Sequence, residues 1–295
     1  MRLRFLTSDV FTDRRFGGNQ LAVLPDAAGL ETDRMQAIAA EFNYSETTFV
    51  LPPRDPAHLA QVRIFTPRAE MPFAGHPTIG TALALHWLGR VAAESAFVLE
   101  LPAGPVPVEL TRDPTAAVFA ELTAPAAATH SAPMDPAPVA RALGLAPGEI
   151  VSGGGLPCTA SCGAPFLLAE LVSLAALGRA WLNSAAGLPK VAVVGVLVFT
   201  RISDTGELRA RMFAPAHGIP EDPATGSAAA ALAGFLASRS DRGEDWHTWR
   251  IAQGIEMGRP SRITVRARRS GGRVAEVRVG GTAVPVAEGT IETAA

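Results

Sequence analysis

The chain has 295 residues and a formal net charge of −2, from 26 basic and 28 acidic residues. This length suggests two domains, and the near balance of charge argues against binding of nucleic acid or an anionic membrane through the overall field. Hydrophobic residues make up 48% and charged residues 18%, which excludes a disordered or fibrous chain. We therefore expect the partner to be a small molecule or a second copy of the chain.

Short β-prone runs recur along the whole sequence, separated by a few helical segments. The expected strands are Leu3–Leu6, Leu21–Leu24, Thr48–Leu51, Gln61–Thr66, Ala96–Leu101, Ala117–Leu122, Phe166–Leu171, Val191–Thr200, Glu207–Phe213, Arg262–Arg268 and Val274–Val279. The expected helices are Glu31–Phe42, Thr78–Leu88, Met134–Leu143, Ser173–Ser184 and Thr225–Ser238. Many strands and few helices predict an α+β fold with largely antiparallel sheets. An Ala- and Pro-rich segment at 123–137 separates an expected N-terminal lobe, 1–122, from a C-terminal lobe, 123–295, whose last strand could return to the first lobe.

Residue counts limit the cofactors and the location of the protein. Lys190 is the only lysine, so a Schiff base or phosphate-binding lysine could be no other residue. Neither GxxxxGK nor GxGxxG occurs, which disfavours nucleotide and dinucleotide sites. Cys158 and Cys162 are too few for a disulfide framework or a four-cysteine zinc site, and we interpret them as structural rather than as a redox switch. The apolar stretches are too short for a membrane span or signal peptide, which predicts a cytoplasmic protein.

The sequence contains an internal repeat. RIFTP at 63–67 is matched by RMFAP at 211–215, and each is followed at the same spacing by an apolar residue and a proline, at 71–72 and 219–220. HPTIGTA at 76–82 then matches DPATGSA at 222–228. The copies lie about half a chain length apart, so the repeat predicts two related lobes.

Each copy of the repeat has the pattern of a strand, a loop rich in Pro and Gly, and the start of a helix. Pro77 and Pro223 suit the first turn of a helix or the turn before it, while Gly80 and Gly226 allow close approach of the backbone. A helix N-terminus offers unpaired N–H groups and the positive end of the helix dipole to an anion. We therefore expect a ligand with a carboxylate to be held between the two lobes.

His76 and Asp222 occupy equivalent positions in the two copies. A basic and an acidic side chain that converge across a cleft could bind a substrate by hydrogen bonds or transfer a proton. Each residue also has a structural alternative, because His76 could cap its own loop and Asp222 could be the N-cap of the following helix.

Glu46 lies in NYSETTFV, residues 43–50, just after an expected helix. The segment is otherwise apolar or hydroxylated, so this carboxylate could be partly desolvated, as a general acid or base requires. The alternative is a solvated carboxylate at the end of a loop, which is the usual position of glutamate.

Several other patterns have simpler explanations. Gly17-Gly18-Asn19 is typical of a tight turn. Arginines at 262, 266 and 268 alternate with apolar residues, which indicates a half-exposed strand rather than a nucleic-acid surface. The GxSxG elbow of serine hydrolases does not occur. A metal site built from residues 46, 76 and 222 has no supporting ligand spacing.

Six blocks together resemble the phenazine biosynthesis PhzF-like isomerase family. They are DVFT at 9–12, GGN at 17–19, SETTFV at 45–50, GHPTIG at 75–80, EDPATGSA at 221–228 and QGIEMGRPS at 253–261. They occur in family order and cover almost the whole chain. The resemblance implies a diaminopimelate-epimerase-like fold of two pseudo-symmetric lobes, each a curved, mostly antiparallel sheet wrapped round a central helix. It also implies an active site between the lobes.

The resemblance further implies a cofactor-independent isomerase that transfers a proton on a small carboxylate-bearing substrate. The best-known member isomerises trans-2,3-dihydro-3-hydroxyanthranilate. By motif position, Glu46 would be the acid/base group, and His76 and Asp222 would position the substrate or relay the proton. The expected substrate-binding residues are Asn19, Gly75, Thr78, Gly80, Gly226 and Ser227.

Other implications concern metals, partners and alternatives. No metal is implied, a homodimer is expected, and the paired cysteines of related racemases do not occur at the helix starts. Gln20 departs from the family, in which proline is more frequent at that place. Two alternatives stay open. One is a hydrolase or dehydratase with the same His, Asp and Glu set, and the other is a binding protein of the same fold without catalytic activity.

Overall fold

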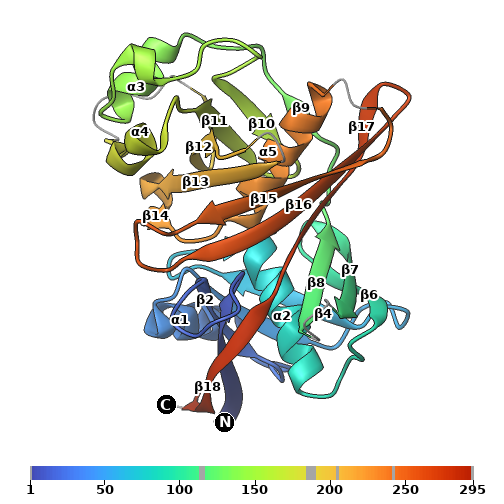
Figure 1. Cartoon of the computed structure of the whole chain (residues 1–295). Helices are drawn as coiled ribbons and strands as arrows, with labels where there is room; N and C mark the ends of the chain where they lie inside the picture. Colours follow the sequence, from blue (N-terminus) through green and yellow to red (C-terminus); the bar gives the residue numbers. More distant parts are fainter. Residues whose placement is uncertain (1, 113–116, 184–190, 204–205, 241–242, 294–295) are drawn as a thin grey trace. The chain divides into compact units, whose positions relative to one another are not determined.

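The computed structural model describes residues 2–112, 117–183, 191–203, 206–240 and 243–293. Lys190 and the end of the expected helix at Ser184 lie outside these ranges. The chain divides into two compact units: unit 1 comprises Met1–Pro125 and Gly280–Ala295, and unit 2 comprises Ala126–Val279. Each unit combines several strands with few helices, which confirms the α+β prediction (Figure 1).

Unit 1 is a sheet that packs on two helices. Its elements are β1 (Arg2–Val10), β2 (Asn19–Leu24), α1 (Thr32–Phe42), β3 (Glu46–Leu51), β4 (Ala60–Phe65), β5 (Glu70–Met71), α2 (Gly75–Trp87), β6 (Ser95–Leu101), β7 (Gly104–Arg112), β8 (Val118–Thr123) and β18 (Ala283–Glu292). Strand β18 pairs with β1 from Arg2↔Glu292 to Val10↔Ala283, so the two ends of the described chain lie side by side (Figure 1).

Unit 2 repeats this composition. Its elements are β9 (Thr129–His130), α3 (Pro136–Ala142), the 3-10 turn η1 (Pro147–Glu149), β10 (Cys158–Ser161), β11 (Pro165–Glu170), α4 (Leu174–Arg179), β12 (Gly195–Arg201), β13 (Glu207–Ala214), the 3-10 turn η3 (Pro215–His217), β14 (Ile219–Asp222), α5 (Gly226–Ser238), β15 (Trp246–Gln253), β16 (Ser261–Ser270) and β17 (Arg273–Gly281). Most described strand pairs in both units are antiparallel.

The order of strand pairing is the same in the two units. In unit 1, β2 pairs parallel with β3, β3 antiparallel with β4, and β4 parallel with β6. In unit 2, β11 pairs parallel with β12, β12 antiparallel with β13, and β13 parallel with β15. Helices α2 and α5 occupy the same place in this order. The sequence repeat therefore extends to the topology of whole units.

One helix lies at the centre of each unit. All residues of α2 from Gly75 to Leu85 are buried, and α2 contacts β1, β2, β3, β8 and β18. Helix α5 is buried over nearly its whole length and contacts β9, β10, β11, β15 and β16. A helix that is apolar on all sides must be enclosed, so the Ala-rich sequence explains why a sheet surrounds each helix.

The repeated Arg and Phe form the same structure in both units. The Arg63 guanidinium lies 5.1 Å from the centre of the Phe65 ring and donates two hydrogen bonds to Glu70, of 2.7 and 2.6 Å. The Arg211 guanidinium lies 5.0 Å from the centre of the Phe213 ring and donates two hydrogen bonds to Glu221, of 2.7 and 2.9 Å. The repeated motif therefore fastens the strand to the segment that follows it.

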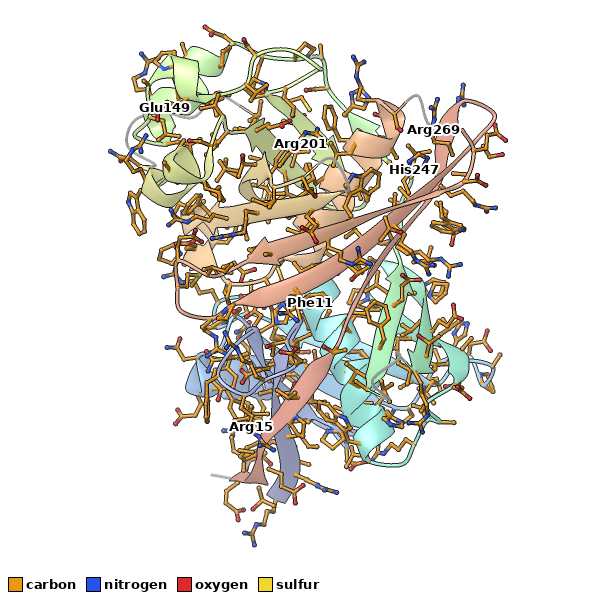
Figure 2. All side chains as sticks on the ribbon, in the orientation of Figure 1. Phe11, Arg15, Glu149, Arg201, His247 and Arg269 are labelled. Atoms are coloured by element: carbon orange, nitrogen blue, oxygen red, sulfur yellow. The ribbon has the colours of Figure 1, made fainter. Side chains whose placement is uncertain are left out.

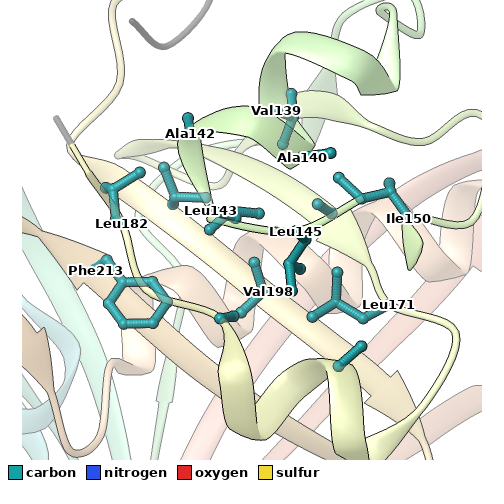
Figure 3. Packing of buried hydrophobic residues seen from close by; sticks show 14 of the residues in the cluster. Val139, Ala140, Ala142, Leu143, Leu145, Ile150, Leu171, Leu182, Val198 and Phe213 are labelled. Carbon is teal, nitrogen blue, oxygen red and sulfur yellow. The ribbon is translucent and has the colours of Figure 1, made fainter. Parts of the chain in front are cut away.

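A compact hydrophobic core in unit 2 joins α3 and α4 to the sheet. It includes the fully buried Leu177 of α4. Val139, Leu143, Val198 and Phe213 are also fully buried and are labelled in Figure 3. Helix α4 is shorter than the expected Ser173–Ser184 helix, because the N–H groups of the next residues bond outside the helix. Trp181 and Asn183 donate to the carbonyls at the end of α3, at Leu143 and Ala142.

The two cysteines are buried in unit 2. Burial raises the pKa of the Cys158 thiol to about 11 and that of Cys162 to about 12. The Cys162 thiol also donates to the carbonyl of Ala230 in α5. A protonated, enclosed thiol is unreactive, which agrees with a structural role.

Gly80 permits close packing of α2 on the sheet, and it yields a first prediction. A Cβ at this position would lie 2.4 Å from Leu21 Cδ2 and 2.6 Å from Val10 Cγ2, and both side chains are fully buried. Gly80→Ala is therefore expected to lower the free energy of unfolding by about 1–2 kcal/mol, because overpacking outweighs the gain in helix propensity. Urea denaturation measures this change.

The matched control is Gly178 in α4, where a Cβ would meet no atom within 4 Å. Gly178→Ala is expected to leave the free energy of unfolding unchanged or to raise it by about 0.5–1 kcal/mol. If both alanine variants stabilise the protein equally, the packing role of Gly80 is wrong.

Candidate active site

Three predicted site residues of unit 1 come together at the starts of their elements. Asn19 begins β2, Glu46 begins β3 and His76 is the second residue of α2. Strands β2 and β3 are parallel, with Leu21 opposite Glu46, so their first residues lie at the same edge of the sheet. His76 Nε2 is 3.4 Å from Glu46 Oε2, and Asn19 Nδ2 is 3.4 Å from His76 Nδ1.

The hydrogen bonds assign the tautomer of His76. The Asn19 amide Nδ2 can only donate, so His76 Nδ1 accepts and carries no proton. The proton is then on Nε2, which faces the Gln20 carbonyl and Glu46 Oε2, each at 3.4 Å. In this orientation of the amide, the Ser45 hydroxyl donates to Asn19 Oδ1 over 2.9 Å.

The loop before Asn19 is held by the residues of two motif blocks. The Asp9 carboxylate accepts a 2.7 Å hydrogen bond from the N–H of Phe16. Gly18 has a positive φ of 61°, and a Cβ there would lie 2.3 Å from the Val10 carbonyl oxygen. The DVFT and GGN blocks therefore shape the turn that delivers Asn19 to the site.

His76 is neutral at physiological pH. Its side chain is 3% exposed, and desolvation lowers its pKa to about 3, against a smaller opposing effect of the hydrogen bond to Gln20. The 3.4 Å contact with Glu46 is therefore made by a neutral imidazole and is not an ion pair. A neutral N–H at Nε2 can orient a carboxylate but does not supply an imidazolium proton.

The lowered pKa of His76 predicts a loss of stability in acid. The unfolded chain binds a proton at this histidine below a pH of about 6.5, whereas the folded protein does so only near pH 3. The free energy of unfolding should therefore fall by about 3 kcal/mol between pH 6.5 and pH 4 through this residue alone. The measurement is urea denaturation at several pH values.

In His76→Gln this part of the acid dependence should disappear, while in His217→Gln, at an exposed position, it should be retained. A pH dependence in His76→Gln that equals that of the unmodified protein would contradict the neutral, buried state of His76.

Unit 2 holds a second cluster around Asp222, the last residue of β14. The Thr225 hydroxyl donates to Asp222 Oδ2. Gln253 ends β15, and its Nε2 donates to the Asp222 carbonyl over 2.8 Å and to Thr225 Oγ1 over 3.2 Å. Gln253 Oε1 accepts from the Thr225 N–H over 3.4 Å. Asp222, Thr225 and Gln253 are buried, so this network fixes the carboxylate beside the start of α5.

The repeat-equivalent residues His76 and Asp222 differ in their local structure. Helix α2 begins at Gly75, so His76 and Pro77 lie inside its first turn. Helix α5 begins at Gly226, so Asp222 still belongs to a strand. A proline in the first turn costs no hydrogen bond, because N–H groups there have no partner in the helix.

The remaining predicted binding residues lie at or near the two helix starts. Gly75 and Gly226 are the first residues of α2 and α5, and Ser227 is half-buried in the first turn of α5. The Thr78 hydroxyl donates to the Ala74 carbonyl over 2.7 Å. Gly80 packs against Val10 and Leu21, so its close approach to the sheet explains why a glycine stands at this position.

Sequence reasoning did not select Ser45, Thr225 or Gln253 as site residues. Ser45 and Thr225 stood within the motif blocks, and Gln253 opened the QG block. The next residue of this block, Gly254, must lack a side chain, because a Cβ there would lie 2.6 Å from the Pro223 carbonyl oxygen. Side chains that only orient another residue give no distinct signal in a single sequence.

The described residues contain neither a metal-ligand cluster nor a helix that could cross a membrane. Within these ranges, no three or more His, Cys, Asp or Glu side chains are arranged to hold a metal ion. None of the helices found there has the length and apolar character to cross a bilayer.

Comparison with known proteins gives consistent relatives. The profile of the PhzC-PhzF family, described as phenazine biosynthesis-like protein, matches residues 8–289. An uncharacterized isomerase of Mesorhizobium japonicum is 43% identical over 97% of this chain and 98% of its own length. The trans-2,3-dihydro-3-hydroxyanthranilate isomerase of Pseudomonas aeruginosa is 38% identical over 97% of this chain and 98% of its own length.

A solved structure shares the fold. The crystal structure of a PhzF-family phenazine biosynthesis protein of Bacillus anthracis superposes with a TM-score of 0.85. The superposition covers 99% of this chain and 99% of that chain, and the two sequences are 23% identical. At this identity the likeness establishes the fold and leaves the reaction to the residues of the site.

Proposed function

The chain belongs to the PhzC-PhzF family of phenazine biosynthesis-like proteins and is an isomerase, and we propose that it acts without a cofactor by proton transfer on a small carboxylate-bearing substrate. The observation that carries this proposal is the Glu46–His76–Asn19 cluster. Glu46 Oε2 lies 3.4 Å from Nε2 of the neutral, buried His76 ring, whose Nδ1 accepts a hydrogen bond from Asn19.

Glu46 is the proposed acid and base. Glu46 is 9% exposed and is the first residue of strand β3, so its backbone is held by the sheet. His76 is proposed to position the carboxylate by contact from a neutral ring, since its low pKa prevents it from acting as an imidazolium acid. One carboxylate could then remove a proton from carbon, exchange it with solvent, and deliver a proton to another carbon on the same face of the substrate.

The substrate carboxylate is proposed to bind at the helix starts. The first N–H groups of α2 and of α5 have no partner within their helices, and the positive ends of the helix dipoles favour an anion there. Gly75, Gly226 and Ser227 occupy these first turns. Asp222, fixed by Thr225 and Gln253, would accept a hydrogen bond from an amino or hydroxyl group of the substrate.

The two half-sites are proposed to act on one substrate molecule. The support is the internal repeat, which gives each unit one helix start with an acid–base or hydrogen-bonding residue at the equivalent position. The equal order of strand pairing in the units supports their common origin. A homodimer and a cytoplasmic location stay predictions.

The test is turnover of small cyclic acids, with trans-2,3-dihydro-3-hydroxyanthranilate, named for a relative, as the first compound. Mass spectrometry of the product separates the candidates. An isomerase leaves the mass unchanged, whereas the alternative hydrolase or dehydratase changes it by one water. Consumption of substrate with an unchanged mass supports the proposal, and a product that differs by one water contradicts it.

A further inference from the structure

Gln253 is a buried amide at the end of β15, the strand that carries His247 in Figure 2. Its Nε2 lies 2.8 Å from the Asp222 carbonyl oxygen, and its Oε1 lies 3.4 Å from the backbone nitrogen of Thr225. A backbone carbonyl can only accept a hydrogen bond, and a backbone N–H can only donate one. These two backbone groups therefore determine which end of the amide is nitrogen and which is oxygen.

The orientation of Gln253 determines the hydrogen bonds of the Thr225 hydroxyl. Gln253 Nε2 can only donate, so Thr225 Oγ1, at 3.2 Å, is the acceptor. The single proton of this hydroxyl is then directed to Asp222 Oδ2. Oδ2 is therefore an acceptor that carries no proton, and the hydrogen bonds run in one direction, from Gln253 through Thr225 to Asp222.

Thr225 is the N-cap residue of α5, but its side chain does not cap the helix. A threonine at this position usually accepts a hydrogen bond from an N–H group of the first turn. The Thr225 side chain makes no such bond, because its oxygen accepts from Gln253 and its proton goes to Asp222. The hydroxyl thus serves the segment before the helix rather than the helix itself.

The internal repeat supplies a comparison for the positions of Thr225 and Gln253. Thr225 corresponds to Ile79 in the aligned motifs. Gln253 corresponds to Leu101, because each follows the last residue pair of its parallel ladder, β13–β15 in unit 2 and β4–β6 in unit 1. Ile79 and Leu101 are both buried and apolar. Apolar side chains are therefore sufficient for packing at this place, and packing does not explain the polar pair of unit 2.

The two units differ in local structure where this pair differs. Helix α2 begins before His76 and includes Ile79, whose N–H pairs within the helix. Helix α5 begins only four residues after Asp222. The segment 222–225 therefore lies outside the helical ladder, and Gln253 supplies a hydrogen-bond partner at each of its two ends. These bonds take the place of those that a further helical turn would make.

We propose that Gln253 is a positioning residue of the isomerase, which holds the segment 222–225 out of α5 and keeps the Asp222 carboxylate in place as a hydrogen-bond acceptor. The inference rests on the proposed binding of a substrate amino or hydroxyl group by Asp222. Without the amide, the segment loses the partners of its backbone groups, and the Thr225 hydroxyl loses the donor that directs its proton to Asp222.

The first test is the crystal structure of Gln253→Leu. Leucine is the residue of unit 1 at the equivalent position, so the variant is expected to fold. The segment 222–225 should be displaced, with loss of the hydrogen bond from Thr225 to Asp222. Gln253→Met, which keeps the unbranched shape of the side chain, should show the same displacement. A segment that stays in place in both variants and retains this hydrogen bond would overturn the role of Gln253, whatever the activity.

The second test is steady-state kinetics on the compound that the unmodified protein turns over, starting with trans-2,3-dihydro-3-hydroxyanthranilate. Gln253→Leu and Gln253→Met should raise KM about tenfold or more, because a hydrogen bond to a charged group is lost. Their kcat should change by less than about threefold, because the contacts of Glu46 are unaffected. The matched control is Gln36→Leu on α1, whose amide also donates to a backbone carbonyl, that of Thr66, and it should alter neither constant.

Thr225 separates the hydroxyl from the rest of the side chain. Thr225→Val should raise KM as the Gln253 variants do, whereas Thr225→Ser, which keeps the hydroxyl, should bring KM back to within about threefold of the unmodified protein. Equal KM values for the two Thr225 variants would contradict the hydrogen-bond chain. A displaced segment with an unchanged KM would also overturn the inference, and it would locate the failure in the proposed role of Asp222 rather than in the hold that Gln253 exerts.

Discussion

Glu46→Gln is expected to lower kcat by at least about 100-fold, while KM changes by less than about threefold. Positioned general acid/base catalysis contributes roughly 10²–10⁴-fold, and glutamine keeps the shape of the side chain but cannot accept the proton. An interaction that acts on the transferred proton should reduce kcat without loss of ground-state binding. Steady-state kinetics on the substrate identified by turnover measures both constants.

The control for this variant is Glu41→Gln, at an exposed position on α1. It should have the kinetics of the unmodified protein. Activity of Glu46→Gln near that of the control would exclude Glu46 as the acid/base group. A large rise in KM at constant kcat would instead indicate that Glu46 only binds the substrate.

Arg211→Met is expected to produce the largest loss of stability, about 3–5 kcal/mol in the free energy of unfolding. Arg211 is 6% exposed and ties β13 to two different segments. Its guanidinium forms the two hydrogen bonds to Glu221 and donates from Nη1 to the carbonyls of Leu177, Gly178 and Ala180 at the end of α4. Methionine fills much of the volume but leaves a buried carboxylate and the carbonyls without their donor.

Arg63→Met is the matched control, because Arg63 occupies the equivalent position in unit 1. Its pair with Glu70 is more exposed, at 19% and 31% of the side chains, and its remaining hydrogen bond goes to the Thr32 hydroxyl. The expected loss is about 1–2 kcal/mol. Equal losses in urea denaturation of the two variants would show that the carbonyls of α4 do not depend on Arg211.

The sequence predicted the fold through the repeat more than through the separate elements. The two Ala-rich helices were found to within a few residues because a helix without a polar face is easily seen. Several strands were not predicted, including β7, β15 and β18. Strand β18 alternates polar and apolar residues only weakly, and its pairing with β1 joins opposite ends of the chain, which no local pattern reveals.

The motif blocks identified the family. The structure shows which of their residues cluster at the candidate site and which hold other residues in place. Glu46, His76 and Asn19, which are far apart in the sequence, form one cluster in unit 1. The neutral state of His76 could not be read from the sequence, because it depends on enclosure of the ring in the folded unit. Gln253 likewise acts only through Asp222 and Thr225.

The most direct test of proton transfer by Glu46 is turnover in D₂O, followed by mass spectrometry and NMR of the product. The proposed mechanism predicts a product with the formula of the substrate that carries deuterium at the carbon that receives the proton, because the Glu46 carboxyl exchanges with solvent. Glu46→Gln should give neither product nor deuterium exchange into the substrate. A product whose mass differs by one water, or undiminished exchange in Glu46→Gln, would contradict the account.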